Sequence, residues 1–341
     1  MAEADQDVPE AVTCSNPACR VAQTGKCVEG LGLSDCSHYG RRPDDTADAL
    51  TEEEKVPQVE GIQIAGADTL TPEEASQLLR AGSARVIAVI GPSDAGKTSL
   101  IASLYDLYQR GQVAGTEYAR SRTLHAFERT CHDARAACRR GTPHSNRTPL
   151  GEVRFYHLDL GGGPAADGLA LIIGDRAGED YRNATDDCST VGGFQEVRRA
   201  DSITVLVDGE RLLNSGKRHN ARSDTLLILR ALVDGGAIES GQRLALVLTK
   251  LDAVLASDSG NRAEAFFTSM LDKVHETFGD HFSEISDFRV AASPKNDQAR
   301  RGTGVAELLS FWLQPRPPVV AVPRAVPEFE RAYARLIVIE G

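Results

Sequence analysis

The chain has 341 residues, which is long enough for one large domain and a smaller one. Of these residues 41% are hydrophobic and 26% charged, a composition typical of a globular protein. No apolar run approaches the ~20 residues that a membrane-spanning helix requires, and the acidic segment Met1 to Glu10 does not resemble a secretion signal. We therefore expect a cytoplasmic protein without a membrane span. The net charge of −11 also argues against nonspecific nucleic-acid binding, because neutralising phosphates with cations supplies most of that affinity.

The acidity is concentrated near the N-terminus. Residues 1–80 hold 16 Asp and Glu against 6 Lys and Arg, whereas the remaining residues hold 33 against 32. The large domain itself is therefore almost neutral, and the excess negative charge belongs to the region before it.

Four cysteines fall within a short polar segment, in the order Cys14, Cys19, Cys27 and Cys36. Disulfides are rare in the cytosol, and so short a segment buries too little apolar surface to fold without another source of order. Thiolates are preferred zinc ligands, so we expect residues 1–40 to form a zinc module with these four as ligands. His38 is an alternative ligand, and unrelated free thiols are the alternative interpretation.

An acidic linker with one short helix is expected over residues 41–83. Thr71 is suited to cap the helix, Pro72 to occupy its first turn and Gly82 to end it.

Strand and helix patterns alternate over residues 84–314. Near-continuous apolar runs predict strands at 86–90, 153–158, 169–173, 202–207, 244–248 and 288–292, and helices are expected at 98–109, 123–140 and 304–312. Such runs separated by helices indicate a mostly parallel sheet covered on both faces. The short glycine-rich turn at 161–164 predicts one antiparallel hairpin. The fold class is therefore a three-layer α/β domain, followed by a Pro-rich linker and tail at 315–341.

A glycine-bounded loop follows the first expected strand, where Gly91 to Thr98 read G-P-S-D-A-G-K-T. A loop between a strand and a helix turns successive backbone N–H groups toward phosphates, at the positive end of the helix dipole. Lys97 would reach the β- and γ-phosphates, and the Thr98 hydroxyl would ligate Mg²⁺. The loop residues expected to bind a nucleotide are Gly91, Ser93, Asp94, Ala95, Gly96, Lys97, Thr98 and Ser99.

Three further elements follow in order, each at a strand end. In the D-x-x-G of residues 175–178, we expect Asp175 to hold Mg²⁺ through water and the Gly178 N–H to meet the γ-phosphate. In Thr249-Lys250-Leu251-Asp252, the Asp252 carboxylate can accept two hydrogen bonds from guanine, whereas adenine offers no donor there. The Lys250 stem would cover the base. Ser293-Pro294-Lys295 would support the guanine O6, although proline removes one donor.

This ordered set resembles the P-loop GTPases of the translation-factor and Ras-like class, over roughly residues 84–314. The Cys-rich N-terminus, G-P-x-D-x-G-K-T, S-R-T-L and D-R-x-G-E-D-Y-R together resemble the bacterial double-GTPase family. The resemblance implies GTP and GDP as ligands and Mg²⁺ as cofactor. It also implies protein partners within multi-gene systems, some of them defensive.

Two positions depart from well-studied GTPases or leave alternatives. Glu179 stands where a Gln or His orients the attacking water; a carboxylate there either positions water or acts as a base, and it also repels the γ-phosphate. Hydrolysis is therefore expected to be slow and partner-dependent. We favour Thr148 as the switch threonine that completes the Mg²⁺ shell, with Thr123 as the alternative. Arg122, Arg147 and Arg176 are candidates for an arginine finger in cis.

The function expected from these observations is a GTP-hydrolysing regulatory switch that contacts protein partners through its switch regions and N-terminal module. An adaptor in which guanine nucleotide is structural is the alternative, and an ATPase is a third reading.

Overall fold

The computed structural model describes residues 14–16, 19–27, 30, 32–36, 38–40, 68–140 and 150–317, with backbone alone at 133–140. The chain divides into two units, Met1–Gln63 and Ile64–Gly341, which are described separately. Thr148, Arg147 and nearly all of the Pro-rich tail lie outside the described residues.

The second unit is built on a seven-stranded sheet in the order β2-β3-β4-β1-β5-β6-β7. Its strands are β1 (Ala84–Ile90), β2 (Glu117–Arg120), β3 (Val153–Gly161), β4 (Leu169–Arg176), β5 (Ser202–Asp208), β6 (Arg243–Thr249) and β7 (Glu284–Arg289). Strand β3 runs antiparallel to β2 and β4, whereas β4, β1, β5, β6 and β7 pair in parallel. The predicted α/β sheet with one antiparallel hairpin strand is confirmed.

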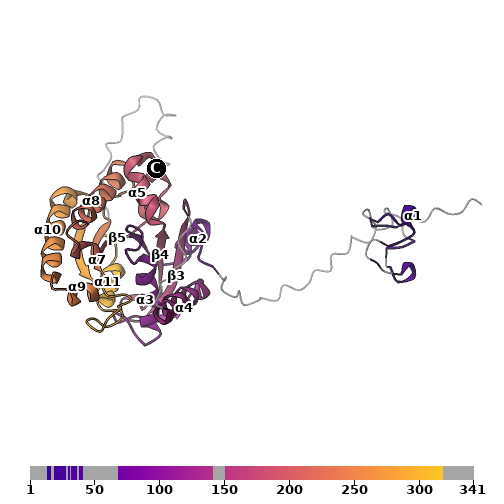
Figure 1. Cartoon of the computed structure of the whole chain (residues 1–341), viewed down its shortest axis with the longest axis horizontal. Coiled ribbons are helices and arrows are strands. Elements are labelled where there is room, and N and C mark those ends of the chain that lie inside the picture. The colour runs from indigo at the N-terminus through magenta and orange to yellow at the C-terminus, as the bar shows by residue number, and fades with distance from the viewer. Residues whose placement is uncertain are drawn as a thin grey trace, which may run out of the picture. The chain divides into compact units, whose positions relative to one another are not determined.

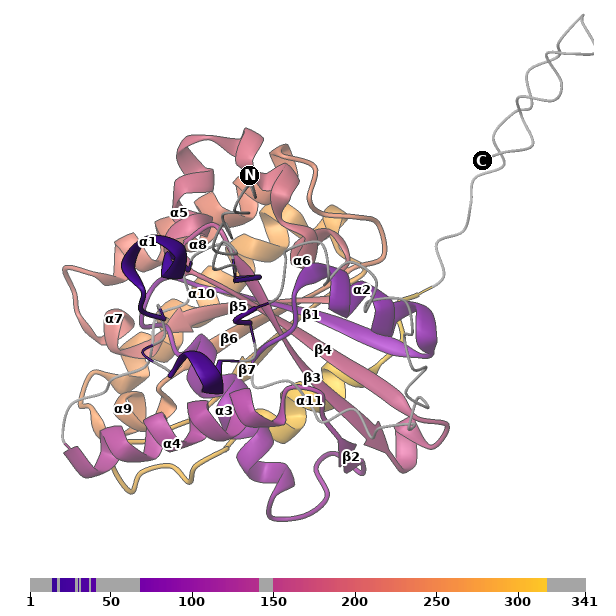
Figure 2. The same ribbon diagram turned by 90° about the vertical axis from the view of Figure 1, so that its right-hand side faces the viewer.

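Helices cover both faces of this sheet (Figure 1). On one face α3 (Lys97–Tyr108), α4 (Leu124–Arg140) and α11 (Val305–Leu313) pack over Ile87 and Val89, and Figure 2 shows α3 and α4 side by side. The other face is covered by α5 (Gly178–Asp186), α6 (Gln195–Arg198), α7 (Gly209–Leu213), α8 (Arg218–Asp234), α9 (Leu251–Ala256) and α10 (Gly260–Phe278). Successive residues of a strand point to opposite faces, so Ala88 and Ile90 contribute to this second core.

Helix α2 (Pro72–Ala81) extends the covering of the second face. Its N-terminus carries the predicted cap as a complete capping box, in which the Thr71 hydroxyl accepts from the Glu74 N–H and the Glu74 carboxylate accepts from the Thr71 N–H. Leu78 packs with Phe155 and Ile172 of the sheet. The helix that the sequence placed in a linker is therefore seated on the domain.

Several strands are a few residues longer than expected, and two differ more strongly from the sequence-based expectation. The last strand was expected at 288–292 and the prediction was wrong in its bounds, because β7 spans Glu284–Arg289 and its partly exposed, polar sequence hides the strand pattern. The apolar Val290 follows the strand, and its N–H donates to Leu248 O. The exposed four-residue strand β2 was not predicted, since a short polar edge strand carries no apolar run.

The described residues of the first unit include two short helices, α1 (Val21–Thr24) and the 3-10 helix η1 (Leu33–Asp35), and a β-bridge between Cys14 and Tyr39. The Sγ atoms of Cys27 and Cys36 lie 4.0 Å apart. Among the described residues, no group of three or more His, Cys, Asp or Glu side chains meets the geometry of a metal site. A search of the same residues for membrane-spanning helices finds none.

Candidate functional site

The phosphate loop leaves β1 at Gly91 and enters α3 at Lys97. Two of its residues adopt the left-handed backbone, Asp94 with φ 64° and Gly96 with φ 95°, which the short polar Asp tolerates and Gly adopts freely. The Lys97 ammonium donates to Gly91 O at 2.9 Å and to Pro92 O at 3.2 Å. Burial lowers the pKa of Lys97, against the raising effect of the nearby acids Asp175, Glu179 and Asp94. The loop thus holds one desolvated cation at the start of a twelve-residue helix.

Strand β4 brings Asp175 beside this loop. Because β1 and β4 are parallel neighbours, their carboxyl ends meet, and the Thr98 hydroxyl donates to Asp175 Oδ2 at 3.4 Å. A hydroxyl and a carboxylate are hard oxygen ligands of the kind that Mg²⁺ prefers. The pair therefore fits a magnesium site at the phosphate end of the cavity.

Gly178 lies against the backbone of the phosphate loop. A Cβ at this position would come within 2.6 Å of Pro92 C and of Ser93 N, closer than nonbonded atoms approach. The close approach requires glycine, and it couples the start of α5 to the loop through direct backbone packing.

The opposite end of the site is built from the end of β6. The Thr249 hydroxyl donates to Ala95 O at 2.8 Å and to Val207 O at 3.2 Å, which ties this strand end to the phosphate loop. Asp252 is 4% exposed, and its Oδ2 accepts from the Lys295 N–H at 2.9 Å. A nearly buried carboxylate is thereby held in a fixed orientation.

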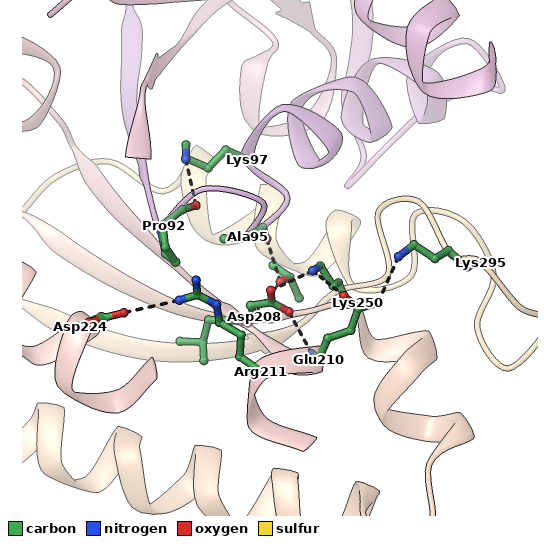
Figure 3. A network of polar contacts seen from close by, with 11 residues as sticks. Pro92, Ala95, Lys97, Asp208, Glu210, Arg211, Asp224, Lys250 and Lys295 are labelled. Carbon is green, nitrogen blue, oxygen red and sulfur yellow. Dashed lines mark hydrogen bonds and ion pairs between the residues drawn. The ribbon is translucent and has the colours of Figure 1, made fainter. Parts of the chain in front are cut away.

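Lys250 sits between two acids. Its backbone is left-handed, with φ 55°, and its ammonium lies 2.8 Å from Asp208 Oδ2 and 2.8 Å from Glu210 Oε2 (Figure 3). Burial lowers the pKa of Lys250, but the two carboxylates outweigh it and the pKa is raised. The second oxygen of Glu210 lies 3.1 Å from the ammonium of Lys295.

These groups surround one cavity of about 370 Å³. The predicted site residues on its wall are Ser93, Asp94, Gly96, Lys97, Thr98, Ser99, Gly178, Glu179, Thr249, Lys250, Asp252, Ser293 and Lys295. Gly91 and Asp175 contact that wall through the bonds to Lys97 and Thr98, and Ala95 is buried under the loop. Thr148 lies outside the described residues.

Sequence reasoning missed Glu210, a further acid that lines this cavity. Its neighbour Asp208 ends a buried strand whose parallel partner is β6, and the register pairs Asp208 with Thr249. Only the adjacency of β5 and β6 brings Glu210 to the cavity, and the order of strands in a sheet cannot be read from one sequence.

Two of the alternative site residues, Thr123 and Arg176, make their contacts outside the cavity. The Thr123 hydroxyl is fully buried and accepts from the His157 N–H at 3.0 Å. Arg176 forms a two-point ion pair with Glu196, at 2.7 and 3.1 Å, and is 4% exposed. Neither side chain points into the cavity in this arrangement, whereas Glu179 lies on the cavity wall.

The chain is similar to many solved structures, and two of them illustrate how distant the likeness is. The Methanosarcina barkeri Roco2 RocCORdC structure bound to GDP matches with 12% identity and a TM-score of 0.35, covering 68% of this chain and 49% of that one. The chain thus spans about half of that protein. The SRb-GTP/SRX complex of the Chaetomium thermophilum signal recognition particle receptor matches with 12% identity and a TM-score of 0.39, covering 68% of this chain and 97% of that one.

No curated protein matches the chain. The model of one family, Double-GTPase 2, matches residues 85–313, which include every strand of the sheet except the first residue of β1 and the whole of the cavity. This match extends over more than half of the 341 residues, so the chain belongs to the Double-GTPase 2 family.

Proposed function

We propose that this chain binds GTP with Mg²⁺, hydrolyses it to GDP and phosphate, and acts as a regulatory switch on protein partners. One observation carries the proposal: a cationic glycine loop and an oriented carboxylate, Lys97 and Asp252, line the same cavity. The first suits a triphosphate and the second suits a guanine base. Membership of a GTPase family agrees with both assignments.

Asp252 supports the guanine preference. Its carboxylate can accept from the N1–H and the exocyclic amine of guanine, while the Lys295 N–H holds Oδ2 in place. Adenine has no donor at these positions, so binding it would leave the nearly buried carboxylate without a hydrogen-bond partner on the base. Such a mismatch accounts for discrimination of several orders of magnitude. The stem of Lys250, held by two acids, would cover one face of the base.

At the phosphate end, Lys97 would exchange its two loop carbonyls for the β- and γ-phosphate oxygens. Thr98 and Asp175 would hold Mg²⁺, with Thr148 completing the shell, and the metal neutralises charge that develops on the transferred phosphoryl group. The Gly178 N–H would meet the γ-phosphate, and the close packing of this residue on the loop supports that role.

Glu179 is the residue we assign to the attacking water. Its carboxylate would position the water or accept its proton, and it would also repel the γ-phosphate. The opposed effects favour slow hydrolysis that a partner stimulates. We place the partner contacts at the residues after Gly178 and at the segment around Thr148, since loss of the γ-phosphate releases such segments.

The cysteine-rich unit supports a second metal. Cys27 and Cys36 have sulfurs 4.0 Å apart, close to the spacing of two thiolates on one tetrahedral zinc ion. The Cys14 pKa is raised: a backbone hydrogen bond from Asn16 lowers it, but desolvation and the Cys19 and Cys36 thiols outweigh that effect. Cys14 is thus influenced by Cys19 and Cys36, and Cys36 lies beside Cys27. We propose that the four cysteines come together on Zn²⁺ in a module for partner contacts.

Competition between nucleotides tests the proposal. GDP should displace a fluorescent guanine nucleotide from the purified chain, while ADP at the same concentration should not. Equal displacement by both, or by neither, would contradict the proposal. An ATPase would show the reverse preference.

A second candidate function is an adaptor in which the nucleotide is structural. Glu179 favours it, because a carboxylate on the wall of the phosphate end disfavours the charge that hydrolysis builds there. Single-turnover hydrolysis of GTP, with and without a candidate partner protein, separates the two. Turnover that a partner accelerates supports the switch, and no turnover under either condition supports the adaptor.

A further inference from the structure

Four charged side chains meet at the base end of the cavity, and the sequence motifs account for only two of them. Asp208 and Glu210 come from the end of β5 and the start of α7, Lys250 follows β6, and Lys295 lies beyond β7. Figure 3 shows Glu210 between the two lysines. Its Oε2 lies 2.8 Å from Lys250 Nζ and its Oε1 lies 3.1 Å from Lys295 Nζ.

One carboxylate therefore joins two segments that are 45 residues apart. Each of its oxygens serves a different ammonium, so one ion pair does not compete with the other. Lys250 is additionally held by Asp208, which is 5% exposed and accepts the Glu210 N–H at 2.9 Å through Oδ1. Asp208 at the end of β5 thus holds both the start of α7 and the Lys250 ammonium.

The same two lysine residues shape the base pocket by different atoms. Lys250 contributes its side-chain stem, whose direction follows from where its ammonium is held. Lys295 contributes its backbone N–H, which orients the Asp252 carboxylate at 2.9 Å. Glu210 therefore contacts both residues that shape the base pocket, Lys250 with its stem and Lys295 with the N–H that orients Asp252.

We propose that Glu210 is a positioning residue for guanine specificity. It acts by bridging Lys250 and Lys295, so that the Asp252 carboxylate is held where it can accept hydrogen bonds from the base edge. The inference rests on the proposed guanine site. It assigns the bridge to a residue outside the motifs and gives α7 a part in base selection.

The bridge is linked to the base edge more than to the phosphates. Glu210 touches Lys250 and Lys295, whereas Lys97 is bonded to the loop carbonyls of Gly91 and Pro92. Loss of the bridge should therefore weaken the contacts that distinguish one purine from another. A general loss of order would instead weaken every nucleotide alike.

The test compares GDP with inosine diphosphate, which lacks the exocyclic amine that Asp252 would bind. In wild type GDP should bind more tightly than inosine diphosphate. In Glu210→Gln we expect GDP affinity to fall about tenfold and inosine diphosphate affinity to fall less, so that the ratio of the two affinities drops at least threefold. Titration calorimetry on the full chain measures both.

The matched control is Glu276→Gln. Glu276 pairs with the Lys273 ammonium at 2.8 Å on the exposed side of α10. This substitution therefore removes a Glu–Lys ion pair that lies away from the cavity. Its affinity ratio should equal that of wild type. A Glu210→Gln and Lys295→Met double variant should lose no more GDP affinity than Glu210→Gln alone, because both changes break the same bridge.

An unchanged ratio in Glu210→Gln, including a parallel loss of both ligands, overturns the inference. Additive losses in the double variant overturn the coupling through Lys295. Failure of the proposed function has a different signature, since the wild-type chain itself would then bind GDP no better than ADP.

Discussion

Asp252 is the residue to which we assign the proposed base preference. It is 4% exposed, and the Lys295 N–H and the Asn296 side-chain amide contact its carboxylate and its backbone carbonyl respectively. Desolvation makes hydrogen bonds to such a carboxylate strong, and it makes an unmatched carboxylate costly. A change that alters only its hydrogen-bonding character should alter which base is accepted.

Replacing Asp252 by Asn is expected to weaken GDP binding at least 100-fold and to improve binding of xanthosine diphosphate. The amide offers a donor where the carboxylate offered an acceptor, and xanthine carries a carbonyl at the position of the guanine amine. Competition titrations with the two diphosphates measure the change. Asp258→Asn, at an exposed position after α9, is the control and should behave as wild type. Unchanged GDP affinity in Asp252→Asn would remove the base assignment.

The first turn of α5 and the phosphate loop act as one unit at the scale of elements. Gly178 begins α5. A Cβ at this position would lie 2.6 Å from backbone atoms of the loop. The loop in turn receives the Thr249 hydroxyl through Ala95 O. The ends of β1, β4 and β6 therefore meet at the phosphate loop, through the close approach of Gly178 and the hydrogen bond from the Thr249 hydroxyl.

Gly178→Ala is expected to displace the loop and to lower stability by about 1–3 kcal/mol, because the added methyl group meets backbone atoms rather than a flexible side chain. GDP affinity should fall with it. Chemical denaturation and nucleotide titration measure the two effects. Gly192→Ala is the matched control, since a Cβ there meets nothing within 4 Å and should leave both quantities near wild type. Equal behaviour of the two variants would contradict the packing argument.

Helix α2 gives a second test at this scale. Its capping box satisfies two N–H groups at the helix start, and Leu78 and Ala75 pack with the sheet. Thr71→Ala should cost about 1 kcal/mol of stability in denaturation experiments, because an N-cap hydroxyl is lost. Thr71→Ser keeps the hydroxyl and should cost less. A loss as large in Thr71→Ser would assign the effect to packing of the methyl group instead.

At the scale of the whole molecule, the cavity and the four N-terminal cysteines belong to different units of the chain. The cavity is lined by residues between Ser93 and Lys295, all within the second unit, whereas Cys14, Cys19, Cys27 and Cys36 belong to the first. A metal in the first unit should therefore be removable without loss of nucleotide affinity.

We expect elemental analysis of the purified chain to find about one zinc ion per molecule, bound by the four N-terminal cysteines. Cys27→Ser should lose most of the zinc and keep its GDP affinity. Cys188→Ser removes an exposed thiol of the second unit and should keep the zinc. Zinc that persists in Cys27→Ser, or is absent from the wild-type chain, would contradict the module.

The sequence by itself determined the elements that have a local cause. Glycine at the phosphate loop and apolar runs in the buried strands are set by the backbone and burial of a few adjacent residues, so the order of the motifs and most strands were predictable. Because motif residues stand at the ends of parallel strands, their meeting on one edge of the sheet followed from the pattern as well.

Tertiary structure alone decided the contacts that join distant segments. The bridge from Glu210 to Lys295, the tie from Thr249 to Ala95 and the commitment of Arg176 to Glu196 depend on which strands become neighbours. The bounds of β7 and the existence of β2 depend likewise on pairing with another strand, since their own residues are polar and partly exposed. Strand order is a long-range property of the folded chain, and no local pattern in one sequence encodes it.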